Sequence, residues 1–561
     1  MVQHRPVSAA HRLLSLDIVL ALLALAGGLR VLYLAAPGPA LPTEAATVAH
    51  VYALGNLTSF ADAGGAGVSP FGWLQLAAAT MVSGAFGRSA TALAAVRETV
   101  LVVSLAGAVL AWFLARRLGL TRWASAAAVL LLAASPLALG LQRLVVVEHL
   151  AAAWALGALV LITRRRARIR HDVAAAVCLL AAVLTSPLAL FFLPAAGWLL
   201  VRRAPVRAAV VAVVLNLGLG IAFGPAAGLL RPHLAAATHP SVGEWAALDP
   251  AWAALAALAL AAAWAVKAVR PLAATGVLLA ATLLVPGVPD TAVLALLLPL
   301  TPLLLAGVAQ AATRRRPPPR HGTANRTATI AATHGGADRR SWTETAHTPA
   351  THPEDTSGRG RTSAPHPRHD SETSRRGPTT GAPHPTHHTD PSPWPEATHK
   401  SANRCVPAAP TPGGRTRRRR TVPALAAAAL VAVLAVSWGA GYPALRPAAD
   451  RGGPLASARD WLHANASGSP LLVDDAAWAE LANSGWPTGM LAAPATCSVL
   501  CPVAEWAVFG SDETALRKHY PALDDAFTGA GPTAVFGSGD TRVTIWRLGL
   551  PPPDPAAPPE A

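Results

Sequence analysis

Four ionisable residues combine possible proton acceptors with cations that can bind a phosphate. Glu44 lies in the first loop after the first apolar run, and Glu148 begins the fourth run. Arg97 and Arg143 lie beside apolar runs, at ends where other basic residues are scarce. A carboxylate can take a proton from a hydroxyl group, and a guanidinium can stabilise a departing phosphate. Whether these residues form one site depends on the elements that carry them.

Each of these residues also fits a structural role. Glu44 precedes a predicted amphipathic helix over residues 45–57, and an acid in the first turn is favoured by the helix dipole. Glu148 could equally cap the apolar run that it begins. An arginine near the outer boundary of a membrane needs a partner or a phosphate, and the sequence leaves both alternatives open for Arg97 and Arg143.

Long apolar runs dominate the chain, with 52% hydrophobic and 14% charged residues among 561. Runs near the length of a bilayer core lie at 17–36, 92–114, 122–140, 148–163, 172–187, 188–201, 207–224, 250–266, 271–286, 290–312 and 422–444. They predict a polytopic α-helical membrane protein with about eleven transmembrane helices. The runs on either side of Ser186-Pro187 are short, and a single broken or re-entrant unit is the alternative there.

Basic clusters occupy every second loop between these runs. They lie at Arg5 and Arg12, Arg116-Arg117, Arg164 to Arg170, Arg202-Arg203, Lys267 and Arg270, Arg314 to Arg316, and Arg417 to Arg420. Because positive loops stay inside, we expect a multi-pass cell-membrane protein with a cytoplasmic N-terminus and an extracytoplasmic C-terminal domain. These clusters account for much of the net charge of +16, so nucleic-acid binding is not indicated.

Composition divides the chain into four parts. Residues 1–312 form the predicted transmembrane domain, with a first outer loop at 37–91. Residues 313–420 are crowded with Pro, Thr, His and Arg and nearly lack Leu, Ile, Val and Phe. No core can form there, so we expect a disordered cytoplasmic linker. Residues 421–445 are the last predicted span, and residues 446–561 follow it outside the membrane.

The last part has the pattern of a small exoplasmic α/β domain. Residues 456–465 suit a helix, and Leu471 to Val473 suit a buried strand. Residues 505–510 and 541–546 alternate as strands do, and the second of these is expected to be the arm of a hairpin. Asp474-Asp475, which follow the first strand, are predicted to lie in a solvated loop.

Two cysteines of the outer part, Cys497 and Cys501, lie close together in the sequence. A local disulfide between them is plausible in an oxidising exterior. Free thiols and a metal site are the alternatives, although a metal would need further ligands close by. We therefore expect the disulfide and assign no metal ligand.

Several stretches of this chain resemble a known family in their order and spacing. They are Thr43-Glu44 with His50 and Tyr52, residues 69–76, Arg97-Glu98, residues 135–149, Trp461 to Gly485, and residues 534–539. The first four stand where that family has an Asp-Glu pair, a His-Pro-Pro-Leu-type stretch, an arginine, and a Ser-Pro, Arg and Leu-Asp-Asn series. The chain thus resembles actinobacterial membrane glycosyltransferases of the family 39 type. These are similar to protein O-mannosyltransferases and lipid A aminoarabinose transferases, in the GT-C fold class.

The resemblance implies a transfer reaction at the outer face of the membrane. A sugar would pass, with inversion, from a polyprenyl-phosphate-linked donor to a cell-envelope glycan or protein acceptor. Glu44 would be the candidate base, and Glu148 a second acid or a metal-site residue. The candidate donor-phosphate or substrate-binding residues are Arg97, Arg143, His50 and His149. No cofactor is assigned, and a divalent metal ion is an open alternative.

Three departures from the family pattern define an alternative function. The family's first-loop Asp, its usual base, is Thr43 here, and a threonine cannot accept a proton at neutral pH. The His-Pro-Pro stretch has become Ser69-Pro70-Phe71, and a Lys-Glu element after the fifth span has become Thr185-Ser186. The alternative is a catalytically degenerate protein that binds a lipid-linked sugar or a partner protein.

Overall fold

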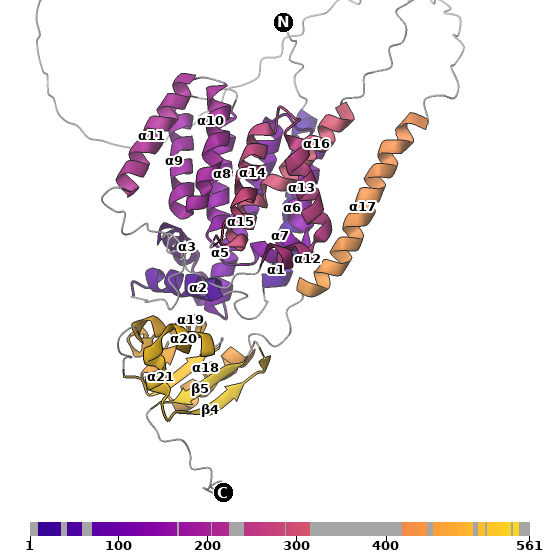
Figure 1. The fold of residues 1–561 in the computed structure, drawn as a ribbon. Helices are drawn as coiled ribbons and strands as arrows, with labels where there is room; N and C mark the ends of the chain where they lie inside the picture. Colours follow the sequence, from indigo (N-terminus) through magenta and orange to yellow (C-terminus); the bar gives the residue numbers. More distant parts are fainter. Residues whose placement is uncertain are drawn as a thin grey trace, which may run out of the picture. The chain divides into compact units, whose positions relative to one another are not determined.

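The computed structural model describes most of the chain outside the predicted linker (Figure 1). The described residues are 9–34, 42–58, 70–164, 168–202, 205–223, 241–286, 288–314, 418–445, 453–497, 503–510, 513–539 and 542–548. Contacts divide the chain into two units, one formed by Met1–Pro317 with Arg420–Ala561 and the other by Pro318–Arg419. Almost all of the second unit, and of the predicted linker, lies outside the described residues.

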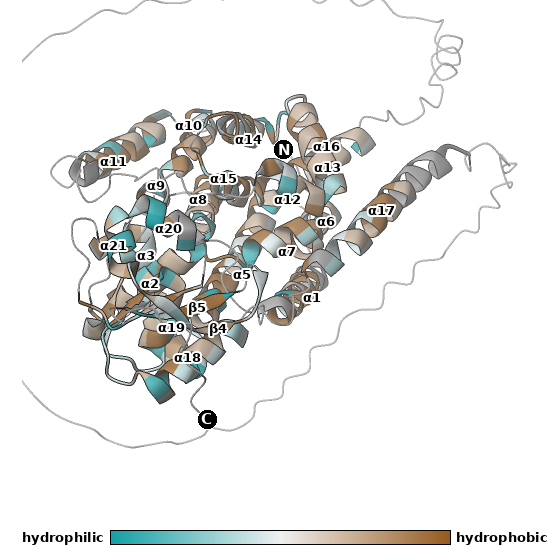
Figure 2. Cartoon of the chain, turned by 60° about the horizontal axis from the view of Figure 1, so that its bottom comes forward, coloured by the Kyte–Doolittle hydropathy of each residue, from teal (hydrophilic) through white to brown (hydrophobic). Residues whose placement is uncertain are grey.

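Helices form the described part of the chain up to residue 445. In chain order they are α1 (Ala9–Leu34), α2 (Pro42–Gly55), α3 (Pro70–Ser83), α4 (Ala85–Arg88), α5 (Ala92–Arg117), α6 (Arg122–Ala134), α7 (Pro136–Gln142), α8 (Glu148–Ile162), α9 (Ile169–Thr185), η1 (Pro187–Phe192), α10 (Leu193–Val201), α11 (Pro205–Phe223), α12 (Val242–Leu248), α13 (Pro250–Ala263), α14 (Arg270–Thr282), α15 (Asp290–Leu297), α16 (Leu300–Arg314) and α17 (Arg418–Leu445). Figure 2 shows apolar residues along much of α11, α13 and α17. The structure confirms a mostly helical chain.

Helix length and composition support fewer membrane spans than the sequence predicts. Among the described helices, α5 alone is long and apolar enough to cross a membrane by itself. Three bent pairs, α6 with α7, α12 with α13 and α15 with α16, satisfy the same requirement as pairs, which gives up to four candidate spans. The predicted multi-pass arrangement therefore stays a prediction.

The bends follow from prolines placed directly after a capping residue. Ser135 ends α6 and caps α7, with its hydroxyl accepting the Ala138 N–H, and Asp249 caps α13 in the same way through the Trp252 N–H. These two caps meet, because Ser135 Oγ donates to Asp249 Oδ2 over 2.8 Å. Ser437 of α17 donates to the other oxygen, Oδ1, over 2.9 Å. The buried Asp249 carboxylate thus connects the break between α6 and α7 and the break between α12 and α13 to α17.

The helix breaks at Ser186-Pro187, where the sequence left a single broken or re-entrant unit as the alternative to two separate spans. Helix α9 ends at Thr185, Ser186 is extended, and a short 3₁₀ helix η1 then leads into α10. Proline cannot donate the backbone hydrogen bond that would continue α9, and it disfavours a helical conformation for Ser186. The end of α9 therefore presents two hydroxyl side chains, Thr185 and Ser186, at a fixed place.

The C-terminal part is an α/β region around one five-stranded sheet. Its elements are α18 (Gly453–Asn465), β1 (Leu471–Val473), α19 (Asp475–Asn483), η3 (Thr488–Met490), β2 (Leu491–Ala492), η4 (Pro494–Cys497), β3 (Trp506–Phe509), α20 (Glu513–His519), α21 (Pro521–Phe527), β4 (Gly531–Phe536) and β5 (Val543–Arg547). The strand order is β2-β1-β3-β5-β4, in which β1 pairs in parallel with β2 and β3. Strands β4 and β5 form the predicted hairpin. The small α/β region is therefore confirmed.

The prediction of a solvated loop at Asp474-Asp475 was wrong. Asp474 is buried and caps α19, with Oδ1 accepting the Ala477 N–H over 2.8 Å. Its other oxygen accepts the Gly510 N–H after β3. Asp475 is the first residue of α19. An aspartate satisfies the free N–H groups at a helix start well, and this capping explains why the acids follow a strand.

The α/β region packs on the first helices of the chain. One hydrophobic cluster joins α2, α3 and α5 to α18, α19, β1, β3 and β5. Tyr52 of α2 lies edge-on to Trp478 of α19, and its hydroxyl donates to the Ala482 carbonyl over 2.9 Å. Burial raises the pKa of Tyr52 above its ordinary value. The tyrosine therefore acts as a neutral hydrogen-bond donor between these two helices.

Candidate functional site

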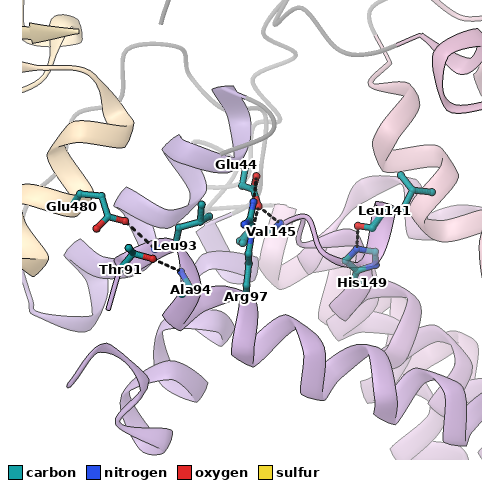
Figure 3. Close-up of polar contacts among 9 residues, drawn as sticks. All are labelled: Glu44, Thr91, Leu93, Ala94, Arg97, Leu141, Val145, His149 and Glu480. Atoms are coloured by element: carbon teal, nitrogen blue, oxygen red, sulfur yellow. Dashed lines mark hydrogen bonds and ion pairs between the residues drawn. The ribbon is translucent and has the colours of Figure 1, made fainter. Parts of the chain in front are cut away.

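The structure brings two of the predicted site residues into direct contact. Glu44 stands in the first turn of α2, and Arg97 lies in the second turn of α5. Arg97 Nε donates to Glu44 Oε1 over 3.0 Å, and Nη2 donates to Oε2 over 3.1 Å (Figure 3). The exposed fractions of the two side chains are 0% for Glu44 and 2% for Arg97. This is a buried, bidentate ion pair, the geometry in which a guanidinium holds a carboxylate most firmly.

A third group completes the environment of Glu44. The Val145 N–H, in the segment between α7 and α8, donates to Glu44 Oε1 over 3.0 Å. Both carboxylate oxygens of Glu44 thus accept hydrogen bonds, and the side chain is sealed from solvent. An acceptor hydroxyl has no route to this carboxylate in the present conformation. The ion pair links α2, α5 and the α7–α8 segment, which is a structural function, and the role of Glu44 as base stays a prediction.

The position of Arg97 depends on how α5 begins. Thr91 caps this helix, with its hydroxyl accepting the Ala94 N–H over 3.1 Å. Glu480 of α19 also reaches the helix start, where its Oε1 accepts the Leu93 N–H over 3.4 Å (Figure 3). Burial raises the pKa of Glu480, although its hydrogen bonds with Leu93 and Ala92 oppose that shift. An acid from the α/β region therefore stabilises the N-terminus of the helix that carries Arg97.

A second polar group gathers around Gln75 of α3, and most of it was not singled out from the sequence. Gln75 Nε2 donates to Thr185 Oγ1 at the end of α9 over 2.7 Å. Its Oε1 accepts from Trp154 Nε1 of α8 over 2.6 Å. The neighbouring Ser186 Oγ donates to Glu148 Oε1 over 3.3 Å. We call these five residues, Gln75, Glu148, Trp154, Thr185 and Ser186, the Gln75 cluster.

The Gln75 cluster is more open than the ion pair. Glu148 and Gln75 are half-buried, and Trp154 is 40% exposed. The Glu148 carboxylate accepts a long hydrogen bond from the Ser186 hydroxyl, and Glu148 starts α8, where the helix dipole favours a carboxylate. Of the two predicted acids, Glu148 is the one that is partly exposed in this conformation.

Close packing holds α3 against the helices that complete the cluster. Gly72 faces Val147 and Thr185, and a Cβ at this position would lie 2.9 Å from Val147 Cβ and 3.4 Å from Thr185 Cγ2. Next to it, Trp73 stacks on His50 of α2, with ring centroids 3.7 Å apart and planes 11° from parallel. The predicted substrate residue His50 thus positions α3, and a glycine in the family-like stretch allows the close approach.

The segment from Leu141 to His149 carries the remaining predicted residues. Arg143 Nη1 donates to the Leu445 carbonyl at the end of α17 over 3.3 Å. His149 Nε2 donates to the Leu141 carbonyl over 3.0 Å, within the segment itself (Figure 3). Arg143 and His149 thus each bond to a backbone carbonyl. The same segment also holds Glu148 and Val145, whose N–H donates to Glu44.

The cysteine and metal predictions are tested only in part. Cys497 is buried and disulfide-bonded, but Cys501 lies outside the described residues, so their pairing stays a prediction. Within the described ranges, no three His, Cys, Asp or Glu side chains are grouped so that they could hold a metal ion. The divalent metal considered from the resemblance is left untested.

Comparisons with known proteins add no assignment. No family model matches the chain, and neither a curated protein nor a solved structure matches it. Its function must therefore be inferred from the sequence and from the geometry of the site.

Proposed function

We propose that the protein is a membrane glycosyltransferase of the GT-C type. It would transfer a sugar from a polyprenyl-phosphate-linked donor to an acceptor at the outer face of the cell membrane. The observation that carries the proposal is the Gln75 cluster, where the Gln75 amide bonds to Thr185 and Trp154 and the half-buried Glu148 carboxylate bonds to the adjacent Ser186 hydroxyl. All of its members except Trp154 come from stretches of sequence that resemble, or depart from, the same family pattern.

The location of the cluster suits a lipid-linked donor. Glu148 begins α8, Thr185 ends α9 and Ser186 follows it, while Gln75 lies in the second turn of α3. We place α8 and α9, which are apolar helices, across the bilayer. The tail of such a donor stays in the bilayer, so the reacting carbon must meet the acceptor where helices end at the interface. The indole of Trp154, about halfway along α8, is 40% exposed and combines an apolar ring with a polar N–H that donates to Gln75.

We assign Glu148 as the group that takes the proton from the acceptor hydroxyl. The hydroxyl oxygen attacks the anomeric carbon, the bond to the donor phosphate breaks, and the polyprenyl phosphate leaves with the electron pair. Ser186 and Gln75 would orient Glu148 and the sugar. The Glu44–Arg97 pair would act indirectly, by holding the α7–α8 segment from which Glu148 begins.

Donor turnover tests this assignment. Purified full-length protein in membranes is incubated with radiolabelled polyprenyl-phosphate mannose, glucose or arabinose and an envelope fraction as acceptor. Removing a general base typically costs about 10²–10⁴-fold in rate, so we expect Glu148→Gln to lose transfer to that extent. Glu98→Gln is the matched control, because Glu98 is an acid of α5 with a 42% exposed side chain that pairs with Arg88. Full activity of Glu148→Gln would remove the assignment.

A catalytically degenerate binding protein is the second candidate, and one observation favours it. The first-loop acid, Glu44, is sealed in an ion pair, and its neighbour is Thr43 where the family has its base. Such a protein would bind the lipid-linked sugar without turnover. This function would be supported over catalysis if the wild-type protein bound a donor saturably but neither released nor transferred the sugar of any of the three donors.

A further inference from the structure

A small cavity lies among α5, α6, α7, α8 and α15, and the α8 residues that line it include the chain neighbours of Glu148 and Trp154. Its polar lining consists of Ser104, Gln142 and His149, and the remaining lining is apolar, including Leu132 and Pro299. The space is sufficient for about one water molecule. Such a cavity inside an apolar helix bundle is notable because each polar group in it must find a partner.

A buried arginine stands directly behind the wall of this cavity. Arg30 of α1 is 5% exposed. Its Nη1 donates to the Ala26 carbonyl, one turn earlier in α1, over 2.9 Å. The side chain therefore lies along α1 and points back toward the start of the helix. Its Nη2 donates to Leu132 O over 3.4 Å and to Gln142 Oε1. Leu132 and Gln142 both line the cavity.

The guanidinium has no counter-charge among the described residues. Its acceptors are two backbone carbonyls and one amide oxygen, and its Nε is buried without a hydrogen-bond partner. A buried cation of this kind is costly in an apolar environment unless an anion lies near it. By contrast, Arg97 and Arg207 each form an ion pair with a carboxylate, Arg97 with Glu44 and Arg207 with Asp172.

Two of the three polar side chains that line the cavity, Ser104 and Gln142, can donate a hydrogen bond into it. Arg30 can only donate, so Gln142 must direct its oxygen to Arg30 and keep its NH₂ group for another acceptor. The hydroxyl of Ser104 is buried without a partner, whereas a helical serine commonly bonds back to its own helix. His149 donates its Nε2 proton to the Leu141 carbonyl, so its Nδ1 can only accept a hydrogen bond. Two free donors and a nearby uncompensated cation suit an anion better than a water molecule, which would leave the charge unbalanced.

We propose that this cavity binds one small monovalent anion, chloride being the physiological candidate. The Ser104 hydroxyl and the Gln142 amide would contact it, and Arg30 would balance its charge through Gln142. The size of the cavity selects against phosphate, sulfate and carboxylates. The site is independent of the transferase assignment, since it uses neither Glu148 nor any other member of the Gln75 cluster.

Binding of radiolabelled chloride to the purified full-length protein tests the proposal. Wild type should show saturable binding with one site per chain, which bromide displaces and phosphate does not. Arg30→Gln should weaken binding by about tenfold or more, and Ser104→Ala by about twofold to tenfold, as expected for loss of a charged and a neutral donor. Arg88→Gln is the matched control, because Arg88 is an exposed arginine paired with Glu98, and it should bind as wild type does.

Two variants are used so that one of them still tests the proposal if the other does not fold. Ser104→Ala removes only a hydroxyl that has no partner in the protein, so it decides the matter where Arg30→Gln does not yield folded protein. Absence of saturable chloride binding in wild type would overturn the proposal. So would equal affinity in wild type and Ser104→Ala, or displacement by phosphate as readily as by bromide.

Discussion

The two acids that the sequence marks out, Glu44 and Glu148, lie in opposite kinds of environment. Glu44 is sealed, and its two oxygens accept bonds from Arg97 and from the Val145 N–H. Glu148 is half-buried and accepts a long hydrogen bond, of 3.3 Å, from the Ser186 hydroxyl. An acid that is fully satisfied holds a structure together, whereas an acid that is incompletely satisfied can accept a substrate. We infer from this comparison that Glu44 stabilises the segment from which Glu148 begins.

Breaking the ion pair should give the largest effect on stability. Arg97→Met leaves the Glu44 carboxylate buried without its cation, and loss of one partner of a buried pair costs about 3–5 kcal/mol. We expect that decrease in the free energy of unfolding, measured by chemical denaturation of the purified protein. The double variant Glu44→Leu with Arg97→Met should recover most of the loss, because no charge is then left buried. If Arg97→Met were as stable as wild type, the pair would not support the site.

Disturbing the packing of α3 should give a smaller effect, concentrated on the Gln75 cluster. In Gly72→Ala the new methyl group would lie 2.9 Å from two atoms of Val147. Overpacking of this kind costs about 1–3 kcal/mol, and it should push Gln75 away from Thr185. We expect both a lower free energy of unfolding and weaker donor binding.

Gly87→Ala is the control for this prediction. Gly87 is also helical, but nothing lies within 4 Å of a Cβ built there. Removing glycine from a helix stabilises it slightly, so this variant should be as stable as wild type or more so, with unchanged donor binding. Equal behaviour of Gly72→Ala and Gly87→Ala would show that the close approach of α3 is unimportant for the site.

Local sequence patterns predicted the elements, but not the contacts between them. The first-turn position of Glu44, the break at Ser186 and the strand from Leu471 to Val473 could all be predicted, since turn residues and short periodic runs determine them. The capping role of Asp474 could also have been predicted, because an aspartate that precedes a helical stretch favours the N-cap position. Asp474 and Asp475 were instead interpreted as part of a solvated loop.

The pairings that define the site depend on tertiary structure. Glu44 and Arg97 lie 53 positions apart, and Gln75 and Thr185 lie 110 positions apart. Nothing in a single sequence indicates which of several arginines will meet a given acid. The roles of Arg30 and Glu480 were missed for the same reason, although an arginine inside the first apolar run is itself a signal, since such a residue is rarely there without a function.

A third acid, Glu480, extends the comparison of Glu44 with Glu148 to the dependence of stability on pH. Changing it should give the smallest effect on the free energy of unfolding. It is buried like Glu44 but meets the N–H groups of α5 instead of a guanidinium, and burial raises its pKa. The folded state therefore holds the Glu480 proton more tightly than the unfolded state. Its contribution to stability is fully present below the ordinary glutamate pKa near 4.5 and declines as the pH rises through the raised value.

Unfolding measured over this pH range in wild type and in Glu480→Gln checks the sign. Glutamine keeps an oxygen for the Leu93 N–H and cannot ionise, so the variant should lose less stability than wild type between pH 4.5 and neutrality. Tyr52→Phe is a suitable reference, since it removes a bond between α19 and a different helix, α2, without changing a carboxylate. An identical pH profile in wild type and Glu480→Gln would mean that ionisation of Glu480 costs the folded state nothing.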